Sequence, residues 1–167
     1  VKRLEPGASF KNQHKSAVAK VRFDGSPILC CKPLTYMNLS GDAVRPLVDY
    51  YDVGLEELLV IHDDIDLPFG AFKLQKNRGA GGQNGVRHIH QQLGTNTYAR
   101  LKVGVGRPSH SQQDVVDYVL SPFSKQETAH IPDLLDRLCQ VVQSFLQDGF
   151  AKASNQWNGR SLFETHD

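Results

Sequence analysis

The sequence predicts an α/β fold, with a single domain in which helices pack around a twisted mixed β-sheet. Segments with strand-like and helix-like spacing of apolar residues alternate along the chain. An Asp24-Gly25 turn joins two strand-like segments, which requires an antiparallel pair. The apolar run Leu58 to Ile61 ends in three carboxylates, as expected for a buried strand that delivers polar side chains to one edge of a sheet.

The first half of the chain predicts a hairpin, a helix and a buried strand. Residues 15–23 alternate in polarity and residues 27–32 return, so we expect a hairpin. Apolar side chains at helical spacing predict a helix over 40–51, with Pro46 awkwardly inside it. The strand over 58–63 follows, and we place it at the centre of the sheet.

The second half continues the alternation and ends in helices. Periodicity and glycine placement predict, in order, a strand at 71–74, a loop at 77–85, a helix at 86–93 closed by Gly94, a strand at 100–106, an ambiguous segment at 114–120, a long helix from Ser124 to Gly149 and a short helix at 150–157.

Length and composition favour one globular domain over residues 1–167. The chain is 40% hydrophobic and 22% charged, and no apolar stretch approaches the length of a membrane span. The spacing of Cys30, Cys31 and Cys139 fits neither a metal site nor a disulfide framework. We therefore expect a cytoplasmic protein with no membrane partner, and we interpret Cys30 and Cys31 as core residues rather than reactive thiols.

Charge is distributed unevenly along the chain although the formal net charge is only +1. No Asp or Glu occurs from Leu67 to Gln113. Cations within that stretch would attract a polyanion if they share a face. A solvated basic face without a partner is the alternative. The cations are Lys73, Lys76, Arg78, Arg87, Arg100, Lys102 and Arg107.

Three polar residues stand at the predicted ends of elements: Asn38 before a helix, Asp63 after a strand and Asn84 where the glycine loop becomes a helix. Asparagine amides can orient water or stabilise an oxyanion, but they do not take protons. A histidine oriented by Asp63 would supply the base. His62 is a poor candidate, because adjacent strand residues point to opposite faces.

Structural roles remain open for several of these residues. Asp64 and Asp66 are as well explained by capping a turn before Pro68, and Asn84 by capping a helix. His88 and His90 are more simply surface or packing residues than bases. Metal binding by the acids is disfavoured, because no His or Cys stands at ligand spacing around them.

Four ordered motifs resemble the bacterial-type peptidyl-tRNA hydrolases, and the resemblance spans nearly the whole chain. They are Tyr36-Met37-Asn38-Leu39-Ser40-Gly41, His62-Asp63-Asp64-Ile65-Asp66-Leu67-Pro68, Gly79-Ala80-Gly81-Gly82-Gln83-Asn84-Gly85, and the segment from Arg100 to Pro108. The resemblance implies hydrolysis of the ester that joins a peptide to the 3′ ribose of tRNA, without a cofactor. It also implies peptidyl-tRNA as the partner, and we expect a monomer.

The resemblance also implies residue roles. Asn38 resembles the asparagine that stabilises the tetrahedral intermediate, and Asp63 the carboxylate that orients the catalytic histidine. Asn84 resembles the asparagine at the mouth of the active site, and Tyr36 an aromatic residue lining the same crevice. The tRNA phosphates would be bound by Lys73, Arg100 and Lys102. The chain departs from the pattern at two positions, Gln75 and Gln83, where the family often has lysine and histidine.

The family's first strand, a Gly-Asn-Pro-Gly loop and the catalytic histidine find no counterpart in this sequence, which begins at Val1. We therefore expect the chain to be an incomplete record of a longer protein. Two alternatives remain: a non-catalytic RNA-binding homologue of the same fold, and a nucleotide-binding α/β domain. The second is disfavoured because Asn84 stands where the dinucleotide fingerprint needs its third glycine.

Overall fold

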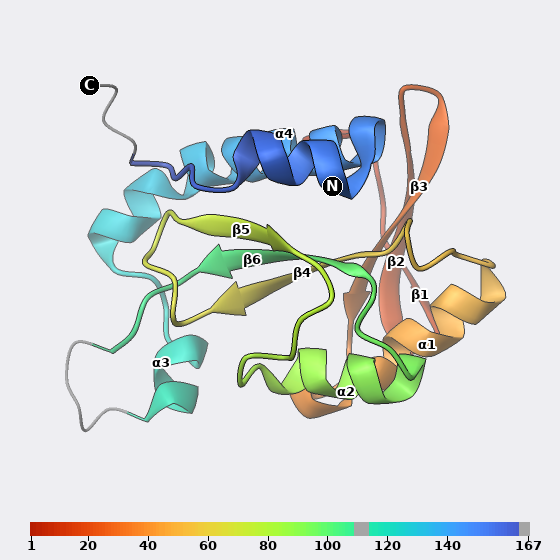
Figure 1. Ribbon diagram of the computed structural model, residues 1–167, viewed down its shortest axis with the longest axis horizontal. Coiled ribbons are helices and arrows are strands. Elements are labelled where there is room, and N and C mark those ends of the chain that lie inside the picture. Colours follow the sequence, from red (N-terminus) through yellow and green to blue (C-terminus); the bar gives the residue numbers. More distant parts are fainter. Residues whose placement is uncertain (109–113, 164–167) are drawn as a thin grey trace. The chain divides into compact units, whose positions relative to one another are not determined.

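The computed structural model describes residues 1–108 and 114–163, and Figure 1 shows its elements. The chain forms two compact units, each made of two separate segments. Unit 1 comprises Val1–Leu58 and Lys76–Tyr98, and unit 2 comprises Leu59–Gln75 and Ala99–Asp167. The chain therefore passes between the units three times. That residues 1–167 form a single domain stays a prediction.

Unit 1 contains an antiparallel sheet of three strands in the order β1-β2-β3. The strands are β1 (Lys11–Gln13), β2 (Ser16–Phe23) and β3 (Ser26–Pro33). Asp24 and Gly25 both have positive φ, at 47° and 79°, as a tight hairpin turn requires. The predicted hairpin is confirmed. Strand β1 was not predicted, because Lys11–Gln13 is polar throughout and carries no alternation.

Unit 1 also contains a 3₁₀ turn and two helices: η1 (Met37–Leu39), α1 (Gly41–Tyr50) and α2 (Asn84–Leu93). All three elements contact one another. A Cβ on Gly41 would lie 2.6 Å from the His88 carbonyl oxygen, so this approach of α1 to α2 needs glycine. The predicted helices are confirmed, as is the stop at Gly94, whose φ is 69°.

Unit 2 contains a mixed sheet made of β4 (Leu59–Asp64), β5 (Phe72–Gln75) and β6 (Ala99–Gly104). Strand β6 pairs in parallel with β4 and antiparallel with β5. The mixed α/β class is confirmed, but two details of the prediction are wrong. The hairpin belongs to a sheet of its own, and β6 rather than β4 lies in the middle of its sheet.

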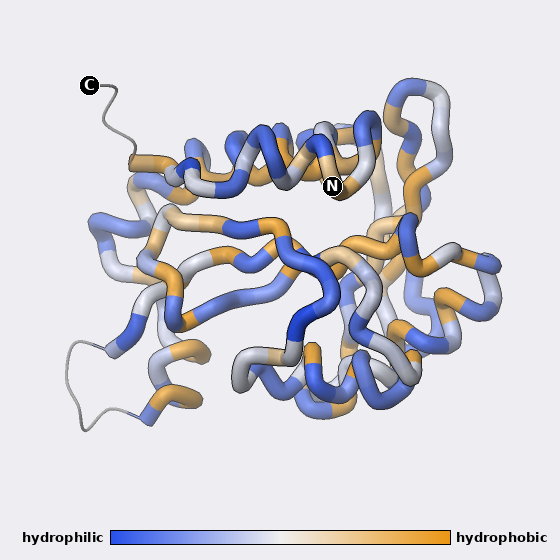
Figure 2. Tube along the Cα trace, in the orientation of Figure 1, coloured by the Kyte–Doolittle hydropathy of each residue, from blue (hydrophilic) through white to orange (hydrophobic). Residues whose placement is uncertain are grey.

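The apolar run of β4 was misleading about its position. An apolar run indicates that both faces of a strand are apolar, but it does not show whether other strands pair with it on one side or on both. In the structure Ile61 is 54% exposed, whereas Ala99 and Leu101 of β6 are buried. Figure 2 shows β4 turning from hydrophobic to hydrophilic along its length, so the strand still delivers its carboxylates at the predicted end.

Helices follow β6 in unit 2. The ambiguous segment is the helix α3 (Val115–Leu120), capped by Asp114. The long helix α4 (Lys125–Trp157) begins at a capping box formed by Ser124 and Glu127. Gly149, with φ 77° and ψ 177°, interrupts it. The prediction of two helices separated at Gly149 is therefore confirmed.

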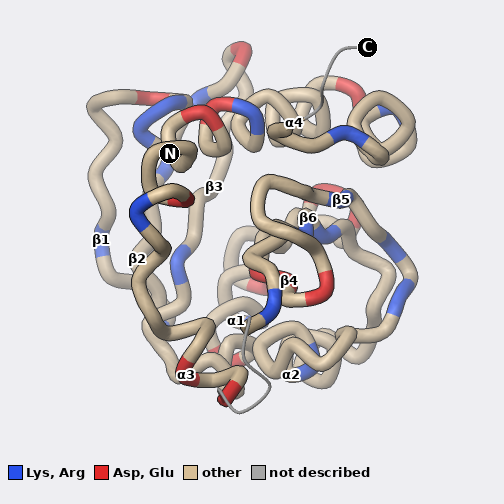
Figure 3. The backbone as a smooth tube through the Cα atoms, turned by 90° about the vertical axis from the view of Figure 1, so that its left-hand side faces the viewer, with Lys and Arg blue, Asp and Glu red and all other residues tan. Residues whose placement is uncertain are grey.

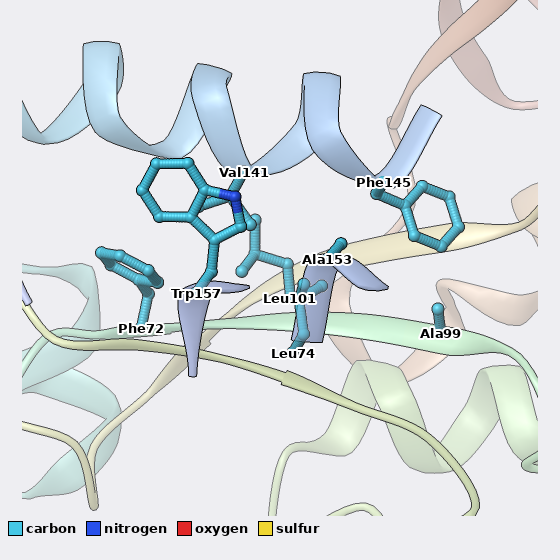
Figure 4. Close-up of a cluster of buried hydrophobic side chains, with 8 residues drawn as sticks. All are labelled: Phe72, Leu74, Ala99, Leu101, Val141, Phe145, Ala153 and Trp157. Carbon is cyan, nitrogen blue, oxygen red and sulfur yellow. The ribbon is translucent and has the colours of Figure 1, made fainter. Parts of the chain in front are cut away.

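The main core of unit 2 lies between α4 and one face of the mixed sheet (Figure 4). Trp157 packs near Phe72, and its indole N–H donates to the Ser144 hydroxyl at 2.8 Å. Eight buried side chains form this core: Phe72, Leu74, Ala99, Leu101, Val141, Phe145, Ala153 and Trp157. Within the described residues, no helix combines the length and the apolar character that crossing a membrane requires.

Candidate active site

Strand register separates Asp63 from its neighbour His62. Asp63 pairs with Val103 of β6, and Val103 pairs with Phe72 of β5, so Asp63 shares the sheet face that α4 covers. His62 pairs with Lys102 on the opposite face. The interpretation that His62 is poorly placed to be the histidine oriented by Asp63 agrees with this register.

The two carboxylates that follow Asp63 in the sequence, Asp64 and Asp66, have structural partners. Asp64 forms an ion pair with Lys102, and Asp66 forms one with Arg107. The Asp66 backbone N–H also donates to the Asp64 carboxylate at 2.7 Å. Burial raises the pKa of Asp64, but the Lys102 ammonium and the Asp66 N–H outweigh burial and leave that pKa below its ordinary value. The turn-capping interpretation is confirmed for Asp64, whereas the Asp66 carboxylate pairs with Arg107 instead.

His62 is held as a neutral imidazole on the face opposite Asp63. Its Nε2 lies 3.3 Å from an Arg100 guanidinium nitrogen, and its Nδ1 lies 2.7 Å from the Asp63 carbonyl oxygen. Arginine can only donate, so Nε2 accepts and Nδ1–H donates to the carbonyl. Burial lowers the pKa of His62, which favours the same neutral form.

The predicted phosphate ligands of unit 2 differ in accessibility. Lys73 is exposed on β5 and pairs in register with Lys102, whose charge is shared with Asp64. Arg100 is only 1% exposed, so its guanidinium does not lie at the surface where the sequence placed it. Figure 3 shows the acidic positions of β4 beside the basic positions of β6. The partner of Arg100 in register on β5 is Gln75, one of the two departures from the family pattern.

In unit 1, Asn38 lies on η1 and Asn84 is the first residue of α2, and both are exposed. Their elements meet through the preceding residues, because the Gln83 amide nitrogen lies 3.3 Å from the Met37 sulfur. Gln83 also caps α2 by accepting from the Val86 N–H at 2.8 Å. Asn84 is therefore not the capping residue, and that alternative is wrong.

A pocket of about 710 Å³ opens beside η1. Tyr36 lines it and is 83% exposed, and a Lys15–Asp42 ion pair of 3.6 Å lies at its wall. An exposed aromatic ring at an open pocket suits contact with an apolar group. Its lining residues are Lys15, Leu34, Thr35, Tyr36, Leu39 and Asp42.

The structure thus groups the predicted site residues in two sets. Tyr36, Asn38 and Asn84 lie on contacting segments of unit 1. Asp63 and the three basic residues Lys73, Arg100 and Lys102 lie on the mixed sheet of unit 2.

Two residues that matter for this geometry were missed or left without a role. Gln83 caps α2 and contacts Met37, and His88 accepts a hydrogen bond from the Gly41 N–H at 3.0 Å. The glycines of the two motifs were the available signal: a Cβ on Gly85 would lie 2.6 Å from the Met37 sulfur.

No cluster of three His, Cys, Asp or Glu side chains suited to a metal ion is found among the described residues. Burial raises the pKa of both Cys30 and Cys31, which disfavours the thiolate and agrees with their interpretation as packing residues.

The protein has a mixed α/β fold with amides and carboxylates at the ends of its elements. Comparison with known proteins identifies the enzyme family. The family model for peptidyl-tRNA hydrolase matches residues 2–165, and the chain belongs to the peptidyl-tRNA hydrolase family.

Relatives and solved structures agree with this assignment. A peptidyl-tRNA hydrolase of Bdellovibrio bacteriovorus is 48% identical over 149 residues, which cover 89% of this chain and 80% of the relative. One of Bacillus subtilis is 44% identical over 136 residues, covering 81% and 72%. The crystal structure of peptidyl-tRNA hydrolase from Acinetobacter baumannii superposes with a TM-score of 0.86 at 27% identity, covering 96% of this chain and 83% of that one.

Proposed function

We propose that this protein hydrolyses the ester between the peptide and the tRNA in peptidyl-tRNA, releasing free tRNA. The match of the peptidyl-tRNA hydrolase family model over residues 2–165 carries the proposal. The relatives described above are named for this activity, and the chain aligns with most of their length.

The chemistry we propose is attack of a water molecule on the ester carbonyl. The water loses a proton to the imidazole of the family's catalytic histidine, which has no counterpart in this sequence. A tetrahedral oxyanion forms, and the ribose oxygen leaves with the proton that the imidazole took up. Asp63 orients that imidazole and stabilises its cationic form. The exposed Asn38 amide donates to the oxyanion, and Asn84 contacts the substrate. Tyr36 lines the crevice that receives the peptide.

For the tRNA backbone we propose Lys73 as the direct phosphate ligand, since it is exposed on β5. Lys102 lies beside it in register and strengthens the local positive field, although Asp64 neutralises part of it. Arg100 is buried and bonds to His62, so we assign it a structural role rather than a phosphate contact.

The test compares release of tRNA from peptidyl-tRNA by the full-length protein and by its Asp63→Asn variant. Loss of an orienting carboxylate should lower kcat on the order of a hundredfold or more. Asp66→Asn is the matched control, because Asp66 is a carboxylate three positions further along the chain, and its exposed ion pair should contribute little. Equal rates for the protein and Asp63→Asn would remove Asp63 from the mechanism.

Asn38→Ala and Asn84→Ala extend the test to the amides. Removing one oxyanion donor typically costs a hundredfold or more in kcat, so Asn38→Ala should fall in about that range. Loss of a substrate contact at Asn84 should raise KM as well. Binding of tRNA without any ester hydrolysis would instead favour the non-catalytic RNA-binding homologue.

A further inference from the structure

The 3₁₀ turn η1 is anchored to α2 on both sides of Asn38. On one side, the Gln83 amide nitrogen contacts the Met37 sulfur at 3.3 Å. On the other side, the Gly41 N–H donates to His88 Nδ1 at 3.0 Å. Within the turn, the Ser40 hydroxyl donates to the Met37 carbonyl oxygen at 2.7 Å. Asn38 therefore lies between two contacts, one made by the residue that caps α2 and one made by α2 itself.

His88 accepts a hydrogen bond from a backbone N–H at the start of α1 that has no acceptor within the helix. The first N–H groups of a helix have no partner within it, and Ser40, which precedes α1, provides no side-chain cap. The Gly41 N–H is the first of these groups, and it receives its acceptor from a residue 47 positions away. Such a cap fixes the start of α1 to α2 rather than to its own preceding residue.

The same hydrogen bond determines the form of the imidazole. Because Nδ1 accepts, it carries no hydrogen, and the neutral ring carries its hydrogen on Nε2. Asp42 Oδ1 lies 3.9 Å and the Gln92 amide 3.4 Å from Nε2. The His88 side chain is 15% exposed. The Gln92 amide nitrogen cannot accept from Nε2–H, and the Asp42 oxygen lies beyond hydrogen-bond distance. Nδ1 is thus the ring nitrogen engaged in a hydrogen bond, which suits a structural acceptor.

We propose that His88 is a positioning residue for the reaction. By capping α1 it holds η1 so that the Asn38 amide keeps a fixed place beside the start of α2, where Asn84 lies. This inference rests on the proposed function, because it takes Asn38 to act on the substrate. A small displacement of an oriented group is enough to lower the rate of the chemical step strongly.

Two substitutions separate this role from simple packing. His88→Leu keeps the bulk of the side chain but removes the acceptor. His88→Asn offers an amide oxygen close to the place of Nδ1 and cannot titrate. His88→Leu should lower kcat by about tenfold or more with KM within about twofold, and His88→Asn should restore most of kcat. The Gly41 amide resonance in NMR should shift in His88→Leu and return in His88→Asn.

Two controls accompany them. Gln91→Ala changes an exposed residue of the same helix and should leave kcat unchanged. Ser144→Ala removes the hydrogen bond to Trp157 in unit 2, so it should lower Tm without lowering kcat. A fall in kcat in His88→Leu but not in Ser144→Ala, at similar losses of Tm, would support positioning over general destabilisation.

Two results would overturn the inference: an unchanged kcat in His88→Leu, or a kcat in His88→Asn as low as in His88→Leu. If the protein releases no tRNA from peptidyl-tRNA at all, the proposed function fails and the positioning role fails with it. An active protein with either of the first two results overturns the role of His88 alone.

Discussion

At the scale of single residues, the end of β4 and the loop after it hold two carboxylates, Asp64 and Asp66, with similar chemistry and different surroundings. Asp64 and Lys102 have side chains only 9% and 18% exposed, whereas Asp66 and Arg107 are 56% and 65% exposed. A buried charge that loses its partner keeps its desolvation cost, whereas an exposed one is solvated by water. The two pairs should therefore differ sharply when one partner is removed.

We predict that Asp64→Asn lowers the free energy of unfolding by about 3 kcal/mol, because it leaves the Lys102 ammonium without its counter-charge. Asp66→Asn should lower it by less than about 1 kcal/mol. Urea denaturation of both variants measures the difference. Equal losses would show that burial does not decide the strength of these pairs.

Acid should weaken the Asp64 pair as well. The folded-state pKa of Asp64 is lowered, so its contribution is present above the pKa of the unfolded chain and is lost as the pH falls through the folded value. The unfolded value for Asp is about 3.9, so this loss occurs below about pH 4. Asp64→Asn should remove that part of the acid dependence, as urea midpoints between pH 3 and pH 7 would measure.

At the scale of elements, the side chain of Asn158 closes the free edge of β5. Its carbonyl accepts from the Leu74 N–H at 2.8 Å and its amide donates to the Leu74 carbonyl at 3.0 Å. The side chain thus pairs with the edge as another strand would. An open edge is a site for pairing between chains, so this contact also protects against association.

We predict that Asn158→Ala lowers the free energy of unfolding by about 1 to 2 kcal/mol, because two groups of Leu74 lose their partners. Hydrogen exchange of the Leu74 amide should accelerate, and the variant should aggregate at lower concentration. Asn155→Ala, an exposed position of α4, is the control. Unchanged exchange at Leu74 would contradict the pairing role of Asn158.

Elements with local signals were predictable from the sequence. The turn at Asp24-Gly25, the helix end at Gly94 and the helix start near Ser124 each depend on a signal that spans only a few residues, and the structure confirms all three. The order of the strands was not predictable, because β4, β6 and β5 are joined by pairing between distant segments.

The residues of the candidate site likewise fall into those that local patterns predicted and those that depend on distant contacts. Asn38 and Asn84 were found because each stands where one type of element changes to another. The hydrogen bond from Gly41 to His88 joins residues that are 47 positions apart, and the contact of Arg100 with His62 joins residues that are 38 positions apart. No local pattern encodes such contacts.

At the scale of the whole molecule, a formal net charge of +1 coexists with an acid-free stretch from Leu67 to Gln113. The structure reduces the free charge of this stretch, because Lys102 and Arg107 pair with Asp64 and Asp66. Lys73 and Arg87 are exposed cations of the same stretch, so a polyanion can reach them.

We predict that affinity for tRNA falls steeply with salt, because phosphate contacts release condensed counterions. Lys73→Ala should reduce the slope of log K against log salt by about one. Lys125→Ala, an exposed lysine at the start of α4, should leave the slope unchanged. Binding titrations between 50 and about 200 mM salt measure both slopes. An affinity independent of salt would contradict a role for these cations.

The way the chain is divided between its two units limits how the protein can be cut or recombined. Val1–Leu58 belongs with Lys76–Tyr98, and β4 and β5 come before the second of these segments while β6 comes after it. No single cleavage can release either unit whole: a break after Leu58 separates the hairpin and α1 from α2, which η1 needs for its anchors. Neither half can therefore be exchanged between proteins as a contiguous cassette.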